Sequence, residues 1–176
     1  MEKYYYKVVE TSTGKVLKNY FERPDPDDEY NGDSIRVPYS VLEKGVQLVK
    51  RVVNQWSDVA TLQDAIFKLG GPANDLVCEY YNAKHWFEKD PSMMALLQLR
   101  IIVAAINEGW EPSSAVDAQK WYAVYDGEVC KAVLGGSVPK QLAVENAKKA
   151  QFICDNFSDL LVDYFYPATV KDDVEE

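Results

Sequence analysis

The residues best suited to chemistry in this chain are a single histidine, three cysteines and several carboxylates. His85 follows Cys78 by seven residues, which places both side chains on one face of a helix. A Cys–His catalytic pair needs a base that activates the thiol and a third group that orients the base. The neighbours Trp86 and Phe87 supply neither. We therefore expect His85 to be a partly buried structural residue, and a single histidine excludes any mechanism that needs two.

Carboxylates offer a second kind of chemistry. Asp64, Asp75 and Glu79 fall in predicted helices, and two acids that share a pocket can act as general acid and general base. On a helix surface such side chains are usually solvated. The sequence therefore predicts no catalytic residue, and a carboxylate-dependent enzyme is kept as the second alternative for the function.

Metal and cofactor sites are not expected either. The acidic segment places Asp27, Glu29 and Asn31 at the first, third and fifth positions of a calcium-loop template. Position twelve of that template requires glutamate, and here it is Pro38. Three cysteines without a Cys-x-x-Cys pair indicate neither a zinc site nor a disulfide framework. We predict a protein with no metal and no cofactor.

Aromatic side chains are the unusual feature of the composition. The 176 residues include 4 Trp, 12 Tyr and 6 Phe, or 12% of the chain. Neighbouring aromatic residues in a predicted strand point to opposite faces, so both faces need cover. Exposed Trp and Tyr give binding area at low entropic cost. We predict a binding surface formed by Trp110, Trp121, Tyr122 and Tyr125; the alternative, that other segments of the chain cover these rings, stays open.

The net charge of −9 is concentrated in two segments. Residues 22–33 contain six acids and one arginine, and residues 171–176 contain four acids and one lysine. We interpret residues 23–39 as an acidic surface loop and residues 167–176 as an acidic tail. The rest of the chain is about neutral and shows no basic stripe, which a nucleic-acid-binding protein needs. We expect no direct binding to nucleic acid.

The sequence shows no membrane span and no signal peptide. The longest apolar stretch, residues 93–106, is interrupted by Gln98 and Arg100, and a span needs roughly 20 apolar residues. The first seven residues lack the apolar core of a signal peptide. We predict a cytoplasmic protein without a membrane partner.

Apolar periodicity and turn residues predict an α+β fold. The expected order is an N-terminal β-hairpin, a four-helix middle with a central buried helix, and a C-terminal antiparallel meander followed by a helix. The hairpin is expected over residues 3–21 and the helices over residues 40–56, 61–69, 72–87 and 92–108. The meander is expected over residues 120–125, 128–134 and 141–145, with the last helix over residues 146–164.

The helix over residues 92–108 is apolar nearly all round and should be enclosed. We expect it to be the hub of a single domain spanning residues 1–176, with both hairpins and the final helix packed around it. Arg100 is the exception on this helix. Because an unpaired buried charge is costly, we expect Arg100 to reach the surface or to pair with an acid from another helix.

A series of short motifs runs through the second half of the chain. Asn-Glu-Gly-Trp-Glu-Pro at residues 107–112 ends one predicted helix, and the strand containing Trp121 and Tyr122 follows. A strand over residues 142–146 then runs into a helix with Phe157 and the sequence Asp-Tyr-Phe at residues 163–165.

In this order of motifs the chain resembles a family of small uncharacterised proteins encoded by gut Bacteroidales, their phages and mobile elements. The resemblance covers about the last 40% of the chain, and it implies a phage or mobile-element origin but no known activity. The chain departs from the family at Ser113 and Ser114, where Asp-Trp is usual, and at Asn146, where an aromatic residue is usual. A phage-encoded protein would act in the host cytoplasm.

Three functions follow from these observations. The first is a non-catalytic interaction or ligand-binding protein whose aromatic surface meets a protein partner or a small aromatic ligand. The alternative is a homo-oligomeric virion or assembly component, in which free strand edges pair between subunits. The second alternative is the carboxylate-dependent enzyme.

Overall fold

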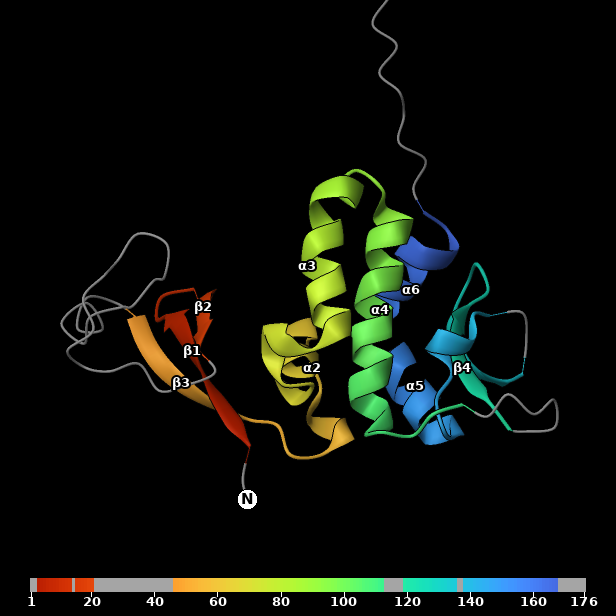
Figure 1. The fold of residues 1–176 in the computed structure, drawn as a ribbon, viewed down its shortest axis with the longest axis horizontal. Coiled ribbons are helices and arrows are strands. Elements are labelled where there is room, and N and C mark those ends of the chain that lie inside the picture. The colour runs from red at the N-terminus through yellow and green to blue at the C-terminus, as the bar shows by residue number, and fades with distance from the viewer. Residues whose placement is uncertain (1–2, 14, 21–45, 113–118, 136–137, 168–176) are drawn as a thin grey trace, which may run out of the picture. The chain divides into compact units, whose positions relative to one another are not determined.

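The computed structural model describes residues 3–13, 15–20, 46–112, 119–135 and 138–167 (Figure 1). These residues combine helices with two small antiparallel sheets, which confirms the α+β class. The chain divides into two compact units, residues 1–54 and residues 55–176. The expectation of a single core throughout the chain stays a prediction. No helix in the described ranges is long and apolar enough to cross a membrane.

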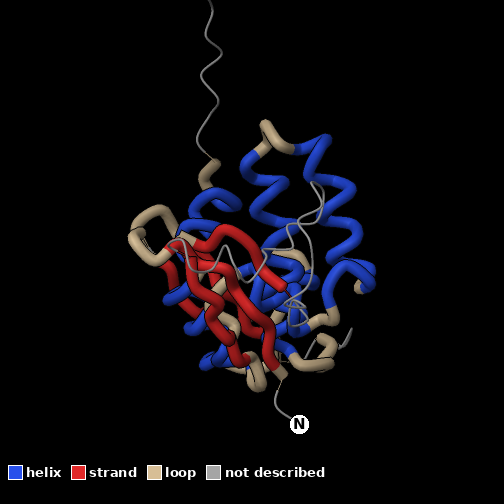
Figure 2. The backbone as a smooth tube through the Cα atoms, turned by 90° about the vertical axis from the view of Figure 1, so that its left-hand side faces the viewer, coloured by secondary structure: helices blue, strands red, loops and turns tan. Residues whose placement is uncertain are grey.

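The N-terminal unit contains a three-stranded antiparallel sheet. Its central strand β1 (Tyr4–Glu10) pairs with β2 (Val16–Tyr20) on one side and with β3 (Val46–Val52) on the other. Figure 2 shows these strands side by side with the usual twist. The pairing of β1 with β2 shifts register between Val8 and Val9, which is typical of a β-bulge.

Strand β3 corrects the helix that the sequence predicts over residues 40–56. The strand pairs with β1 without interruption from Tyr4 opposite Val52 to Glu10 opposite Val46. Its valines are β-branched and favour extended backbone, and a short apolar run fits either periodicity. A two-stranded hairpin alone is marginally stable, so a third strand stabilises the sheet. The hydrogen bonds to β1 therefore favour a strand over a helix in this segment.

The remaining expectations for this region lie outside the described residues. They comprise the acidic loop at residues 23–39, the calcium-loop template within it and the first part of the helix predicted over residues 40–56. The acidic tail lies outside them as well, except for its first residue, Pro167.

The C-terminal unit begins with a series of helices, and local hydrogen bonds determine where its α-helices start. The 3-10 helix η1 (Trp56–Asp58) leads to α2 (Leu62–Lys68), and the 3-10 helix η2 (Gly71–Ala73) leads to α3 (Asp75–Phe87) and α4 (Pro91–Asn107). The residue before each α-helix accepts a backbone N–H bond through its side-chain oxygen, as N-cap residues do. These residues are Thr61, Asn74 and Asp90, with N···O distances of 3.1, 3.0 and 2.9 Å.

Helix α4 is the centre of the C-terminal unit, as Figure 1 shows. It packs against α2, α3 and α6 (Ser158–Phe165). More than half of its residues are buried: Ala95, Leu97, Leu99, Ile101, Ile102, Val103, Ala105, Ile106 and Asn107. A helix with apolar residues on opposite faces must be enclosed, because each buried Leu or Ile contributes about 1.5–3 kcal/mol.

Among the later elements of the chain, α6 and the 3-10 helix η3 (Lys140–Leu142) contact α4, and the C-terminal strands pack on the final helices. Strand β4 (Trp121–Tyr125) pairs with β5 (Cys130–Leu134), and this hairpin packs mainly on α5 (Ala147–Asn156) and, through β4, on α6. Because α6 contacts both α4 and β4, the final helices join the hairpin to the central helix. The sequence predicts a hairpin packed on the central helix itself.

Two elements of the structure differ in detail from those expected from the sequence. The strand expected over residues 141–145 is reduced to the 3-10 helix η3 (Lys140–Leu142) and one bridge between Trp121 and Val144. The helix expected over residues 146–164 is divided into α5 and α6 at Phe157, which has φ −133° and a buried side chain. A single straight helix cannot keep its apolar stripe on both α4 and the hairpin, so the bend follows from packing.

Replacement of Leu99 by aspartate is expected to abolish folding of the C-terminal unit. Leu99 is 1% exposed, so the substitution removes about 1.5–3 kcal/mol of burial and adds several kcal/mol for an unpaired buried carboxylate. Near-UV circular dichroism and urea unfolding would report the loss of the cooperative transition. The control Gln98→Asp, at a half-buried polar position of the same helix, should cost less than about 1 kcal/mol. A cooperative transition retained in Leu99→Asp would contradict the central position of α4.

Candidate functional site

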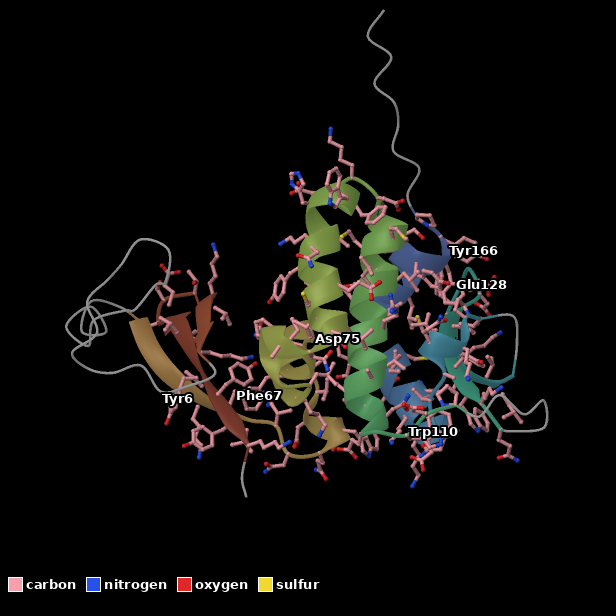
Figure 3. All side chains as sticks on the ribbon, viewed as in Figure 1. Tyr6, Phe67, Asp75, Trp110, Glu128 and Tyr166 are labelled. Carbon is pink, nitrogen blue, oxygen red and sulfur yellow. The ribbon has the colours of Figure 1, made fainter. Side chains whose placement is uncertain are left out.

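A cavity of about 200 Å³ lies beside Trp110, just beyond the C-terminal end of α4 (Figure 3). Three parts of the C-terminal unit form its walls: the start of α3, the second half of α4 with the chain that follows it, and the η3 turn. The lining residues are Leu76, Arg100, Val103, Ala104, Asn107, Trp110, Pro112, Lys140, Gln141 and Ala143. Most of these side chains are apolar, and an apolar cavity with a few polar groups is typical of ligand sites.

The end of α4 places the Trp110 ring. Glu108 and Gly109 both have left-handed backbone, with φ 54° and φ 89°, and this conformation ends a helix sharply. No atom lies near the position that a Cβ at Gly109 would take, so glycine is needed there for its φ and not for space. The N–H of Trp110 then donates to the carbonyl of Asn107 at 3.0 Å, which turns the chain back toward the helix end.

Two polar side chains of α4 line this apolar cavity. Arg100 and Asn107 are seven residues apart and therefore share one face of the helix. Arg100 Nη1 lies 2.7 Å from Oε1 of Glu79 on α3, which confirms the expected partner from another helix. Asn107 is 6% exposed, and its Nδ2 donates to the carbonyl of Ala143 at 2.9 Å. These two bonds tie α4 to α3 and to the end of the η3 turn.

Each of these side chains also keeps one polar atom without a partner. Arg100 Nε, a donor, and Asn107 Oδ1, an acceptor, are buried and make no hydrogen bond within the described part of the chain. A buried polar atom without a partner costs about 1–3 kcal/mol. The two atoms are unpartnered inside the packed wall, behind the surface that lines the cavity.

A second hollow, of about 310 Å³, adjoins the first and is more polar. It is lined by Glu111, Pro112, Lys140 and Gln141, and the last three also line the inner cavity. One acidic and one basic side chain face this hollow, so neither sign of charge predominates. Together the two spaces form a site with an apolar inner part and a polar outer part.

The structure separates the four aromatic residues predicted to form one binding surface. Trp110 lines the cavity. Trp121 is half-buried and exchanges two backbone hydrogen bonds with Val144, at 3.1 and 2.8 Å. Tyr122 is 4% exposed, so its ring belongs to the core and a docking partner could not cover it. This is a correction, and its reason is that Tyr122 points to the enclosed face of β4, opposite to Trp121.

Tyr125 lies in a separate aromatic contact at the hairpin turn. Its ring packs edge-on against Tyr166, with centroids 5.5 Å apart, and its hydroxyl donates to the carbonyl of Gly127 at 3.0 Å. Gly127 has φ 104°, and a Cβ there would lie 3.4 Å from the Tyr166 hydroxyl. Figure 3 shows Trp110 and Tyr166 toward opposite ends of the C-terminal unit. This contact closes the turn and is separate from the cavity.

The carboxylates considered for catalysis do not converge. Asp64 is fully buried and accepts hydrogen bonds from Ala60 N at 3.1 Å and Thr61 Oγ1 at 2.9 Å, so it stabilises the start of α2. Glu79 pairs with Arg100, and Asp75 is exposed in the first turn of α3. None of the three lines either cavity. In the ranges that the structure describes, no cluster of His, Cys, Asp or Glu could hold a metal ion.

Cys78 and His85 are both exposed on α3, so the expectation of a partly buried histidine is wrong. The imidazole packs edge-on against Trp86, with centroids 5.4 Å apart. Neither residue lines the cavity beside Trp110 or the adjoining hollow.

Sequence reasoning found Trp110 but missed the residues that face it. A signal for Arg100 and Asn107 is present, because two polar residues seven positions apart interrupt one face of an otherwise apolar helix. Lys140 and Gln141 give no such signal, since they reach the site through the fold of a turn far along the chain.

No family model, curated protein or solved structure matches this chain. The resemblance to proteins of Bacteroidales phages and mobile elements stays a prediction.

The buried thiol of Cys154 predicts a loss of stability at alkaline pH. Burial raises the pKa of Cys154 to about 11, with a smaller contribution from the nearby Cys130, whereas an unfolded thiol has a pKa of about 8.5. As pH rises through this interval, the unfolded chain loses its proton first, so the free energy of unfolding falls. We expect this thiol to account for a decrease of the order of 1–2 kcal/mol.

Urea unfolding under reducing conditions at pH 8, 9 and 10 would measure this decrease. The variant Cys154→Ala lacks the thiol, so its free energy of unfolding should fall less over the same interval. The exposed Cys78 provides the matched control, because Cys78→Ala should keep the wild-type slope. Equal slopes for all three proteins would contradict the prediction.

Proposed function

We propose that this protein is a non-catalytic ligand-binding protein and that its site is the cavity beside Trp110. The observation that carries the proposal is a cavity of about 200 Å³ with mostly apolar walls, an aromatic ring and four polar side chains. An apolar cavity of roughly 150 Å³ is large enough for benzene. The inner cavity therefore suits one aromatic ring, either of a small molecule or of a side chain on a partner protein.

The adjoining hollow supports the same function. Lys140 and Glu111 can contact the polar remainder of a ligand whose ring occupies the inner cavity. Apolar contacts supply most of the affinity in such sites, and a few polar groups orient the ligand. Among the described residues no two carboxylates converge at either space, so the described lining gives no support to a hydrolytic or transfer reaction there.

A ring probe tests the proposal directly. We expect 4-methylacetophenone, titrated into the protein, to shift the indole N–H resonance of Trp110, assigned with the variant Trp110→Phe. Ala104 lines the cavity, and Ala104→Leu should fill it and weaken binding about tenfold or more, as added methylenes clash in a confined space.

The matched control is Ala147→Leu, at a half-buried alanine of α5 that does not line the cavity. It should bind the probe as the unaltered protein does. Undiminished binding in Ala104→Leu, or shifts confined to the other tryptophans, would contradict the assignment of the site.

We propose a homo-oligomeric assembly component as the second candidate. Strand β5 has β4 on one side, and its other edge has no strand partner among the described residues. Val129, the residue before β5, and Leu134, its last residue, are 57% and 55% exposed. An edge with exposed apolar side chains can pair with a second copy of the same strand, although the charge of Lys131, the second residue of β5, opposes such pairing.

Light scattering after size-exclusion chromatography tests this candidate. Edge pairing predicts a mass of at least twice 20.0 kDa at high protein concentration, and Leu134→Lys should restore the monomer, because a charge at the edge disfavours pairing. The exposed residue Tyr81 on α3 lies outside the hairpin, so Tyr81→Lys should leave the mass unchanged. A monomer at every concentration would contradict the assembly.

A further inference from the structure

We propose that the sheet of the N-terminal unit binds single-stranded nucleic acid through Tyr4, Tyr6 and Lys50. The observation that carries the inference is a cluster of two tyrosine rings and one lysine on one face of the sheet. The cluster belongs to a different unit from the cavity beside Trp110, and the inference does not rest on the function proposed for that cavity.

Strand pairing places the three side chains of the cluster on the same face. Tyr4 and Tyr6 are two residues apart in β1, so both point to one side of the sheet. Lys50 of β3 lies directly opposite Tyr6, and residues directly opposite each other in an antiparallel pair share a face. The two rings pack edge-on with centroids 5.7 Å apart, and Lys50 Nζ lies 4.1 Å from the centre of the Tyr4 ring.

The cluster is accessible at the surface of the sheet. Tyr4 is 40% exposed, Lys50 is exposed and Tyr6 is half-buried. On the opposite face of the same strand, Tyr5 is fully buried. The aromatic rings of β1 thus divide into one that belongs to a core and two that a ligand can contact.

The sheet is basic although the chain as a whole is acidic. Its three strands contain four cationic residues and one acid, Glu10, which gives them a net charge of +3, whereas the whole chain has a net charge of −9. The four cationic residues are Lys7, Lys18, Lys50 and Arg51. The charge of the strands is complementary to that of a phosphate backbone.

The pairing of β3 with β1 explains why the sequence shows no such patch. Lys50 and Arg51 lie far from Lys7 in the sequence, in a segment that was expected to be helical. In the sheet, Lys50 and Arg51 lie directly opposite Tyr6 and Tyr5. The expectation that the chain does not bind nucleic acid was based on the order of charges along the sequence, and the sheet brings those charges together.

The tyrosine rings favour a single-stranded nucleic acid over other polyanions. Surfaces that bind single strands combine aromatic side chains, on which bases stack, with cations that contact the phosphates. One stacked base is worth about fivefold to a hundredfold in affinity, and a cation–π contact at an exposed site is worth about twofold to fivefold. A base that stacks on Tyr4 can therefore replace the contact with Lys50, whose ammonium group then pairs with a phosphate.

Fluorescence anisotropy with labelled oligonucleotides tests the inference on the full chain. We expect binding of oligothymidylate, oligouridylate or both, each of about 12 nucleotides, at about 50 mM salt. The tighter of the two shows whether the site prefers DNA or RNA. Inorganic polyphosphate and double-stranded DNA offer no unstacked base, so each should bind about fivefold more weakly or less than that.

A tyrosine variant assigns the stacking contact. Tyr4→Leu keeps an apolar side chain but lacks the ring, so it should weaken binding of the oligonucleotide about fivefold to a hundredfold. Tyr81 of α3 is 46% exposed, similar to Tyr4, and Tyr81→Leu is the matched control that should bind as the unaltered protein does. If Tyr4→Leu disrupts the sheet, as circular dichroism would show, the comparison of oligothymidylate with polyphosphate in the unaltered protein decides.

A lysine variant assigns the phosphate contact. Lys50→Gln should weaken binding and reduce the slope of log affinity against log salt concentration by about 0.7, the value for one phosphate contact on a single strand. Lys84→Gln, at an exposed lysine of α3, removes the same charge elsewhere and should keep the slope.

Failure of both oligonucleotides to bind under these conditions would overturn this inference and leave the ligand-binding function of the cavity intact. Equal affinity for polyphosphate and oligothymidylate would overturn it as well, because the site would then bind any polyanion. Undiminished binding in a folded Tyr4→Leu variant would place the nucleic acid elsewhere on the chain and would also contradict the inference.

Discussion

The burial of α4 is the constraint on which the C-terminal unit depends. A helix of 17 residues with apolar side chains on opposite faces cannot lie at a surface, so α2, α3 and α6 must surround it. The bend at Phe157 follows from the same constraint, since it lets α6 pack on α4 while α5 packs on the hairpin. The capped helix starts and the left-handed turn at Gly109 adjust the ends of helices whose positions α4 determines.

The polar residues of α4 show how a buried helix accommodates side chains that need partners. Arg100 reaches Glu79 on α3, and Asn107 reaches the carbonyl of Ala143 beyond η3. Each bond satisfies part of a side chain and leaves one atom unused. Both residues line the cavity beside Trp110, which lies along the second half of α4. The candidate site is therefore formed at the border of the buried core, near the C-terminal end of this helix.

The N-terminal unit depends on a different constraint, the hydrogen bonds of the backbone. Strand β1 has both edges paired, one by β2 and the other by β3. Because β1 and β3 are far apart in the sequence, the spacing of apolar residues within one segment cannot predict their pairing. It nevertheless provides seven paired positions, enough to override the helical spacing of the apolar residues in β3.

The sequence by itself determined the α+β class, the starts of α2, α4 and α5, and the burial of α4, because each depends on neighbouring residues. Thr61, Asp90 and Asn146 act as caps by accepting a hydrogen bond from the amide three residues further along the chain. Only the tertiary structure decided that residues 46–52 form a strand, that Tyr122 is buried and that Trp110 faces Lys140 and Gln141 across a cavity. These features depend on contacts between residues far apart in the chain. Such contacts stabilise a conformation only after the elements have packed together.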